Sequence, residues 1–310
     1  MIEIVALSDS MREAVGLAER VAPTDANVLI TGESGAGKDA LAAFIHSRSH
    51  RGARAIVKID CAALSSELLE AELFGYERGA FTGAVETKPG RLEAAHKGTL
   101  ILDEIAYLPT DAQAKLLRVI ETREFERLGG RRTIKVDSRL IALTNVDLTQ
   151  AVLRRDFRED LFYRLNVVQI RVPPLRQRRE DLPALIQGFL TTYSRKHGRP
   201  AAGIAPATLA VLREYEFPGN VRELANTIER AVIVASGQQV EESDLPAAVR
   251  DAVKFRSRRE QPRTLAQLEA EYVTEILGAT KGNKAEAARI LGISRKNLYE
   301  RIARLGKDEG

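Results

Sequence analysis

The sequence predicts an α/β fold, in which a mostly parallel sheet carries helices on both faces and is followed by an all-helical subdomain and a small helical domain. Short apolar runs alternate with helical patterns from about residue 27 to residue 172. The pattern is helical from Glu180 to Ser236 and again from Thr264 to Gly306. The expected parts are the sheet subdomain at residues 1–172, the helical subdomain at 173–237, a basic linker at 238–263 and the last domain at 264–310.

Five short runs are expected to be the strands of the sheet. Each run is apolar along most of its length, which is typical of a strand that is buried on both faces. Helical patterns lie between the runs, and this order favours parallel pairing with crossover helices. The expected strands are Asn27–Thr31, Ile56–Asp60, Thr99–Asp103, Arg139–Thr144 and Val167–Val172.

A glycine-rich segment after the first strand has the pattern of a phosphate-binding loop. Glycines let backbone N–H groups converge on phosphate oxygens, and the N-terminus of the following helix adds its dipole. Lys38 is expected to reach the β- and γ-phosphates. The pattern ends in Asp39 instead of Ser or Thr, so a hydroxyl ligand for Mg²⁺ is missing there. The residues of this candidate site are Gly32, Glu33, Ser34, Gly35, Ala36, Gly37, Lys38 and Asp39.

Two carboxylates end the third strand, at the edge of such a sheet where ligands bind. Asp103 is expected to hold Mg²⁺, directly or through water. Glu104 is expected to polarise the attacking water molecule. The alternative is a solvated loop in which both acids cap the next helix.

One six-residue segment between these two motifs has a single large apolar side chain. Its two glycines make it a poor helix and a poor strand, so we expect a loop that presents Phe81 to a partner. The alternative is a mobile turn whose aromatic ring folds back into the core. The segment consists of Gly79, Ala80, Phe81, Thr82, Gly83 and Ala84.

The end of the chain predicts two short helices separated by a glycine. Asn283 can cap the first helix, with Glu286 as the second half of a capping box, and Gly292 stops it. Ser294 can cap the second helix, whose buried stripe is Leu298, Ile302 and Leu305. The side chains left for bases and phosphates of DNA are Ser294, Arg295, Lys296, Asn297, Tyr299, Arg301 and Arg304. The alternative is a protein-interaction module with a solvated basic face.

The distribution of charge agrees with a DNA-binding end. Residues 251–310 contain 13 Lys and Arg against 9 Asp and Glu, which accounts for the whole net charge of +4. A local positive excess is typical of a part that binds a polyanion, although an excess this small also serves solubility. The chain of 310 residues has no apolar run long enough to span a membrane and no signal-peptide pattern. The single cysteine, Cys61, excludes an internal disulfide and fits a reducing cytoplasm.

Nine ordered segments in the first 224 residues or so resemble the AAA+ ATPases of bacterial enhancer-binding proteins, the activators of sigma-54 RNA polymerase. Residues 265–305 resemble the Fis-type helix-turn-helix. In the enhancer-binding family Asp39 is an accepted ending of the phosphate loop. The matching segments are Gly32–Asp39, Cys61–Leu64, Glu72–Gly75, Gly79–Ala84, Leu102–Ile105, Phe157–Leu161, Tyr163–Val167, Pro173–Arg176 and Phe217–Leu224.

The resemblance implies a role for two arginines in a ring. Arg158 and Arg164 match the paired arginine fingers, which reach the γ-phosphate held by the neighbouring subunit, so hydrolysis would need a ring, usually a hexamer. A guanidinium there can neutralise charge on the phosphoryl oxygens in the transition state. The alternative for both is a surface ion pair with Glu159 or Asp160.

The resemblance also implies two sensor residues, and this sequence differs from the family at one position near the site. Asn145 matches the first sensor and Arg222 the second, while Asn220 could be only a helix cap. The family commonly has Asn at the position of Asp60, where it is thought to restrain the catalytic Glu. A carboxylate there would repel Glu104 or share a proton with it, so we expect altered regulation of hydrolysis, not its loss.

The function implied is that of a sigma-54-dependent transcriptional activator. It would bind double-stranded enhancer DNA and use ATP and Mg²⁺ in a homo-oligomeric ring to remodel the closed complex of sigma-54 RNA polymerase holoenzyme, with residues 79–84 contacting sigma-54. The helix before the helix-turn-helix is expected to form a dimer. The first alternative is a DNA-binding regulator that keeps the fold but acts by occupancy; the second is a general AAA+ remodeller, against which the DNA-binding end argues.

Only about thirty residues precede the phosphate loop, too few for a receiver or ligand-sensing domain. Control by a separate regulatory protein, control by abundance, and a sequence that is part of a longer protein all remain open.

Overall fold

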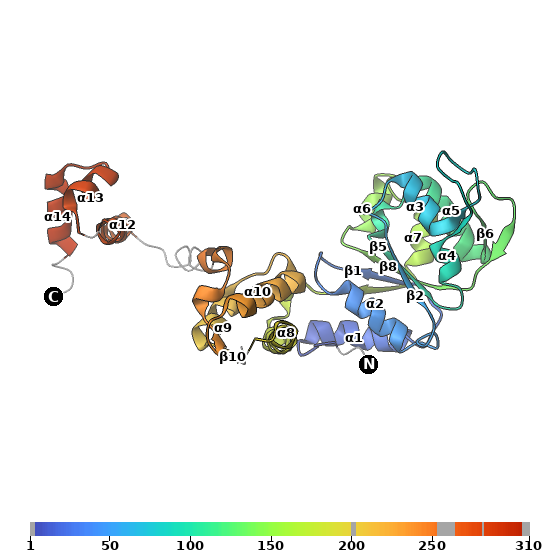
Figure 1. Cartoon of the computed structure of the whole chain (residues 1–310), viewed down its shortest axis with the longest axis horizontal. Helices are drawn as coiled ribbons and strands as arrows, with labels where there is room; N and C mark the ends of the chain where they lie inside the picture. Colours follow the sequence, from blue (N-terminus) through green and yellow to red (C-terminus); the bar gives the residue numbers. More distant parts are fainter. Residues whose placement is uncertain (1–3, 200–202, 253–263, 281, 306–310) are drawn as a thin grey trace. The chain divides into compact units, whose positions relative to one another are not determined.

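The computed structural model describes residues 4–199, 203–252, 264–280 and 282–305, and its contacts divide the chain into two compact units (Figure 1). The first unit is Met1–Val249 and the second is Arg250–Gly310. Among the described residues, none of the helices combines the length and the apolar character needed to cross a membrane.

The core of the first unit is the parallel α/β sheet that the sequence predicts. Its five strands lie in the order β2-β5-β8-β1-β9, and every neighbouring pair is parallel. The strands are β1 (Val28–Thr31), β2 (Ile56–Asp60), β5 (Thr99–Asp103), β8 (Arg139–Thr144) and β9 (Val168–Arg171). All five lie where the sequence places them, within one residue at each end.

Helices cover both faces of the sheet (Figure 1). Successive side chains of a strand point to opposite faces, so Val28 and Ile30 pack with one group of helices and Leu29 with the other. On the first face lie α1 (Asp9–Val21) and α2 (Lys38–Ser47). On the second lie α3 (Ser66–Phe74), α4 (Arg91–Ala94), α5 (Thr110–Thr122), α6 (Leu148–Leu153) and α7 (Glu159–Leu165).

The two outer strands differ from the expectation that every strand is buried on both faces. β2 and β9 each have a neighbour on one side only. Ile56 is 43% exposed, and in β2 only Ile59 is buried. Apolar sequence alone does not reveal which strands become edges, because that depends on the order of strands in the sheet.

Two short hairpins extend from the sheet subdomain, and the sequence analysis did not identify either. One pairs β3 (Gly75–Tyr76) with β4 (Lys88–Pro89), and the other pairs β6 (Glu124–Glu126) with β7 (Thr133–Lys135). They touch where Tyr76 bridges to Leu128. Strands of two or three residues are too short for a periodic pattern to appear in the sequence.

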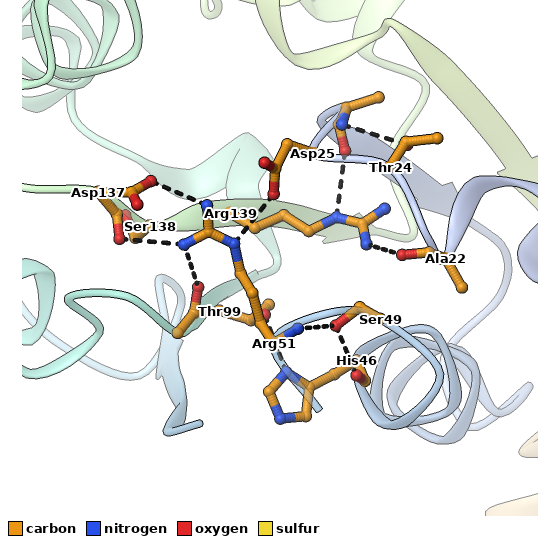
Figure 2. A network of polar contacts seen from close by, with 12 residues as sticks. Ala22, Thr24, Asp25, His46, Ser49, Arg51, Thr99, Asp137, Ser138 and Arg139 are labelled. Atoms are coloured by element: carbon orange, nitrogen blue, oxygen red, sulfur yellow. Dashed lines mark hydrogen bonds and ion pairs between the residues drawn. The ribbon is translucent and has the colours of Figure 1, made fainter. Parts of the chain in front are cut away.

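A network of polar contacts joins the end of α1 to the edge of the sheet where the strands begin (Figure 2). Arg139 opens β8, is 1% exposed and donates to the carbonyl oxygen of Ala22 at 2.6 Å. Carbonyls at the end of a helix have no partner within the helix, so this buried guanidinium satisfies them. Beside it, Arg51 forms ion pairs with Asp25 at 3.0 Å and with Asp137 at 2.9 Å.

The helical subdomain, or lid, follows β9 and has its own apolar core. It contains α8 (Leu182–His197), α9 (Pro206–Glu214), α10 (Asn220–Val234) and the short paired strands β10 (Gly203–Ile204) and β11 (Gln239–Val240). The lid continues past residue 237, where the sequence predicted the linker to begin, because Val240, Leu245 and Val249 pack into the same core. The rest of the expected linker, from residue 253 to 263, lies outside the described residues.

The second unit is a small helical bundle. Its helices are α12 (Leu265–Ala279), α13 (Lys284–Ile290) and α14 (Arg295–Leu305). Val273, Ala287, Ala288 and Leu298 form its buried core. Within α13, Ala287 and Ala288 are buried, whereas Ala285 is only half-buried.

Candidate nucleotide site and interaction surfaces

The glycine-rich segment forms a tight loop between β1 and α2. Gly35 and Gly37 take the left-handed backbone conformation, with φ of 73° and 106°. A Cβ on Gly35 would lie 2.4 Å from the carbonyl oxygen of Gly219, so the lid approaches the loop too closely for any other residue. α2 begins at Lys38 directly after the loop, and a helix N-terminus in this position favours a phosphate group.

Lys38 lies inside this site. Its side chain is 7% exposed, and its ammonium donates to the carbonyl oxygen of Gly32 at 2.9 Å. The same ammonium lies 3.5 Å from Oε1 of Glu104. The loop and the end of β5 therefore share one cation.

Glu104 is held in an unusual backbone conformation. It follows β5 with φ of 51°, which is uncommon for a residue other than glycine and costs on the order of 1–3 kcal/mol. Its Oε2 accepts a hydrogen bond from the backbone N–H of Asn145 at 3.1 Å. Asn145 follows β8, the neighbour of β5 in the sheet. The structure thus brings Lys38, Glu104 and Asn145 together, as their positions after the strands predict.

Lys58 is part of this site, and the sequence analysis did not identify it. It lies in β2, which pairs with β5. Its ammonium is 2.7 Å from Oδ2 of Asp103 and also forms an ion pair with Asp39. Partial burial alone would lower the pKa of Lys58, but its hydrogen bonds to Asp103 and Asp39 raise that pKa overall. The signal that could have identified Lys58 is the pairing of β2 with β5, which follows only from the strand order.

The carboxylates present fit a magnesium ion. Asp103 is partly buried, with 16% of its side chain exposed, and Asp39 lies across Lys58 from it. Among the described residues, no three His, Cys, Asp or Glu side chains converge as a metal-binding group. Mg²⁺ bound with a nucleotide commonly takes one or two protein carboxylates, with phosphate and water oxygens as its other ligands. The donor set therefore suits Mg²⁺ together with a phosphate ligand.

Asp60 ends β2 beside Asp103 in the register of the sheet. Its Oδ1 accepts a hydrogen bond from the backbone N–H of Ala62 at 2.9 Å. The next residue, Cys61, is buried, and burial together with the charges of Asp60, Asp103 and Glu104 raises the pKa of its thiol to about 12. Burial is the main cause of this shift, and the three carboxylates at this edge add to it.

The lid contacts the phosphate loop directly. The carbonyl oxygen of Gly35 accepts hydrogen bonds from the backbone N–H groups of Val221 (3.0 Å) and Arg222 (3.3 Å) in the first turn of α10. The guanidinium of Arg222 donates to Oγ of Ser34 at 3.1 Å. A cavity of about 570 Å³ lies between loop and lid, with Ser34, Arg222 and Arg230 in its lining. The predicted second sensor therefore touches the predicted phosphate site.

Glu33 and Asn220 extend this contact. Glu33 is paired with Arg176, which follows β9, and Asn220 donates to Glu33 at 3.1 Å. Hydrogen bonds from Arg176 and then Asn220 lower the pKa of Glu33 to about 2. The alternative in which Asn220 is only a helix cap does not hold, because its side chain joins the loop to the segment after β9.

The two predicted arginine fingers lie at the surface around α7. Arg158 precedes the helix and forms an ion pair with Asp160 at 2.7 Å, which is one of the alternatives that the sequence left open. Arg164, in the last turn, lies 3.2 Å from Glu121. The side chains of Arg158 and Arg164 are 42% and 61% exposed, so a second molecule can reach both.

Residues 79–84 lie within the loop between β3 and β4. The loop is closed by a hydrogen bond from the Gly79 N–H to the Ala84 carbonyl at 2.8 Å. Phe81 is 40% exposed, and its ring meets the edge of the Tyr76 ring at a centroid distance of 5.0 Å. The alternative in which Phe81 folds back into the core does not hold, because the ring rests on the hairpin.

The second unit carries the predicted helix-turn-helix. Asn283 caps α13 through its side chain, and Oγ of Ser294 accepts from the backbone N–H of Asn297 at 3.2 Å. Three further side chains predicted to meet DNA are exposed: Arg295, Lys296 and Tyr299.

One predicted DNA contact differs. Arg301 was expected to face outward to phosphate, but it is half-buried and forms an ion pair with Glu269 of α12. The side chains of Arg304 and Leu305 lie outside the described residues.

Comparison with known families assigns each part of the chain. A model of the sigma-54 interaction domain matches residues 4–171. Models of the AAA+ ATPase lid domain and of the Fis family of bacterial regulatory proteins match residues 176–262 and 264–305. The chain belongs to the sigma-54 activator family. The parallel sheet, lid and helix-turn-helix are thus an AAA+ P-loop ATPase fold with a Fis-type domain, as the sequence resemblance implied.

Several relatives of this sigma-54 activator match over nearly its whole length. The regulatory protein AtoC of Escherichia coli (strain K12) is 44% identical over 313 residues, covering 98% of this chain and 68% of AtoC. The transcriptional regulatory protein ZraR of Salmonella typhimurium is 44% identical over 301 residues, covering 97% of this chain and 68% of ZraR. The crystal structure of NtrX from Brucella abortus in complex with ATP has a TM-score of 0.76 and 36% identity, covering 98% of this chain and 70% of NtrX.

Proposed function

We propose that this sigma-54 activator binds enhancer DNA, assembles into a ring and uses ATP hydrolysis to remodel the closed complex of sigma-54 RNA polymerase at a promoter. The observation that carries the proposal is the meeting of Lys38, Glu104 and Asn145 beside the phosphate loop, in a chain of this family. The ATP complex of the related NtrX supports a nucleotide at this place.

The site residues then have distinct tasks. Backbone N–H groups of residues 32–37 hold the phosphates, and Lys38 exchanges the Gly32 carbonyl for phosphate oxygens. Glu104 orients and polarises the attacking water, while Asn145 fixes the position of Glu104. Asp103 would hold Mg²⁺, which would offset the negative charge of the phosphates.

A neighbouring copy of the chain completes the site. Arg158 and Arg164 exchange Asp160 and Glu121 for the γ-phosphate of the next subunit, so hydrolysis depends on a ring, which we expect to be a hexamer. The helix-turn-helix unit, paired as a dimer, would bind a two-fold symmetric DNA site. On the basis of the family, we place this activity in the cytoplasm. Control by a separate regulatory protein is compatible with this proposal.

We also propose that Asp60 tunes hydrolysis. Its carboxylate lies at the same edge as Asp103 and Glu104, where it adds a third negative charge to the site. Asp60→Asn should change the ATPase rate and its response to polymerase. Equal rates for both proteins, with and without polymerase, would remove this role.

The test of the proposed function is transcription in vitro from a sigma-54 promoter. Wild type with ATP should open the promoter. Glu104→Gln should still bind ATP but hydrolyse it about 10²–10⁴-fold more slowly, because the general base is lost, and should not open the promoter. If Glu104→Gln activates as well as wild type, or wild type changes transcription only by occupying DNA, the chain acts as a DNA-binding regulator and not as an ATP-driven activator.

A further inference from the structure

Lys58 joins two carboxylates of the candidate site. Its ammonium contacts Oδ2 of Asp103 at 2.7 Å and forms an ion pair with Asp39. Asp103 is the proposed magnesium ligand, and Asp39 occupies the position where a phosphate loop of the general pattern carries a hydroxyl. The loop therefore carries one more negative charge than that pattern, beside a site for a polyanion.

The second cation of the site cannot neutralise these two acids. Lys38 is engaged with the Gly32 carbonyl and with Glu104. Lys58 is 42% exposed, whereas Lys38 is 7% exposed, so Lys58 can move away from its partners at lower cost. An ammonium ion and a divalent cation use the same carboxylate oxygens, so they compete for Asp103.

We propose, building on the proposed ATP site, that Lys58 is a positioning residue that sets how strongly nucleotide and divalent cation depend on each other. Because Lys58 offsets the negative charges of Asp39 and Asp103, a nucleotide can bind at the site without a metal ion. When a divalent cation binds Asp103, Lys58 gives up that carboxylate. Removing the Lys58 charge should therefore weaken metal-free nucleotide binding and strengthen metal binding, two changes of opposite sign.

The test compares wild type with Lys58→Met as full-length chains. In EDTA, calorimetry should show ATP binding roughly three- to tenfold more weakly to Lys58→Met, since one positive charge near the phosphates is gone. With the non-hydrolysable analogue AMP-PNP bound, electron paramagnetic resonance should show Mn²⁺ binding roughly three- to tenfold more tightly, since its competitor is gone. A general loss of structure would weaken both and cannot produce opposite signs.

Matched variants separate charge from folding. Lys58→Arg keeps the charge and should behave like wild type in both assays. Lys88→Met removes a lysine of similar exposure that pairs with Glu72, away from the site, and should change neither. If Lys58→Met does not fold, Lys58→Gln, which keeps a hydrogen-bond donor without the charge, takes its place.

Two failures are distinguishable. If wild type binds neither ATP in EDTA nor Mn²⁺ with AMP-PNP, the proposed ATP site itself is wrong and this inference falls with it. If wild type binds both and the charge-removing variant shifts neither affinity, or shifts both in the same direction, the role of Lys58 alone is overturned.

Discussion

At the scale of the residue, Asn220 joins three segments that are far apart in the sequence. It is fully buried, at the start of α10, with φ of 55°. Its Oδ1 accepts from the Leu175 N–H at 2.8 Å, and its Nδ2 donates to the Ser34 carbonyl at 3.1 Å. Asparagine suits this position because it tolerates the left-handed conformation and offers both donors and an acceptor.

Asn220→Gly should lower the free energy of unfolding by about 1–3 kcal/mol, because buried backbone groups of Leu175 and Ser34 lose their partner. Glycine keeps the positive φ without strain, so the loss reports the hydrogen bonds. Urea unfolding measures it. Asn226→Gly makes the same change at an exposed position of the same helix, and an equal loss there would show that helix propensity, not the buried contacts, is responsible.

His46 predicts a pH effect on stability. Its ring is buried, and Nδ1 lies 2.9 Å from Oγ1 of Thr99 (Figure 2 shows both residues). Burial lowers the pKa of His46 in the folded chain below its ordinary value. Below about pH 6.5 the unfolded chain therefore binds a proton that the folded chain resists, and the free energy of unfolding falls with decreasing pH, by at most about 1.4 kcal/mol per unit.

Unfolding at a series of pH values measures this. His46→Gln should lack the part of the pH dependence that begins near pH 6.5. His50→Gln, at an exposed histidine nearby, is the control and should follow wild type. A wild type and His46→Gln with parallel pH profiles would contradict the assignment.

Individual site residues could be predicted where a local motif fixes them. Lys38 and Glu104 follow from a loop and a strand end, each readable in a few residues. Lys58 and the Glu33–Arg176 pair could not be predicted, because their contacts depend on the order of the strands in the sheet and on how the lid packs against the phosphate loop. Arg301 was assigned to DNA because it is a basic residue on a recognition helix. The sequence does not show that Glu269, in another helix, lies beside it.

At the scale of the element, the first turn of α10 is packed on the phosphate loop. The carbonyl of Gly35 accepts two of its backbone N–H groups, so loop and lid helix share hydrogen bonds that each would otherwise lack. A lid that moves when nucleotide binds either breaks these hydrogen bonds or moves together with the loop. Backbone hydrogen bonds therefore join the lid to the site, in addition to the side-chain contacts of Asn220 and Arg222.

Gly35→Ala tests this contact. Alanine there has a positive φ and would meet the Gly219 carbonyl at 2.4 Å, so we expect weaker ATP binding and a loss of about 2 kcal/mol or more in the free energy of unfolding. Gly198→Ala also has a positive φ, of 60°, but its Cβ meets no atom within 4 Å. Calorimetric ATP binding and urea unfolding should separate the two. Equal effects would show that backbone strain alone explains Gly35.

Central elements were easier to predict than edges. β1, β5 and β8 are apolar and inside the sheet, so pattern and burial agree. β2 and β9 lie at the edges and include polar residues, Lys58 in β2 and Gln169 and Arg171 in β9, and the hairpin strands are too short to show a period. The loop at residues 79–84 was predictable because two glycines exclude regular structure, yet its support by Tyr76 was not.

At the scale of the whole molecule, the proposed ATPase needs more than one copy of the chain. Arg158→Ala and Glu104→Gln should each hydrolyse ATP very slowly alone. A mixture should regain activity, because some interfaces then combine an intact Glu104 from one subunit with an intact Arg158 from the next. Steady-state phosphate release from mixed and separate proteins measures this. An inactive mixture, or an active Arg158→Ala protein, would assign Arg158 to its surface pair with Asp160 instead.

We propose that ATP hydrolysis reaches sigma-54 through the loop that carries Phe81. The most direct test of this proposal measures promoter opening and ATP hydrolysis side by side for Phe81→Ala, with Val85→Ala as control, since Val85 is an exposed apolar residue close by. We predict that Phe81→Ala keeps ATP hydrolysis and DNA binding but fails to open a sigma-54 promoter, while Val85→Ala does all three. A Phe81→Ala protein that opens the promoter as well as wild type would contradict the account.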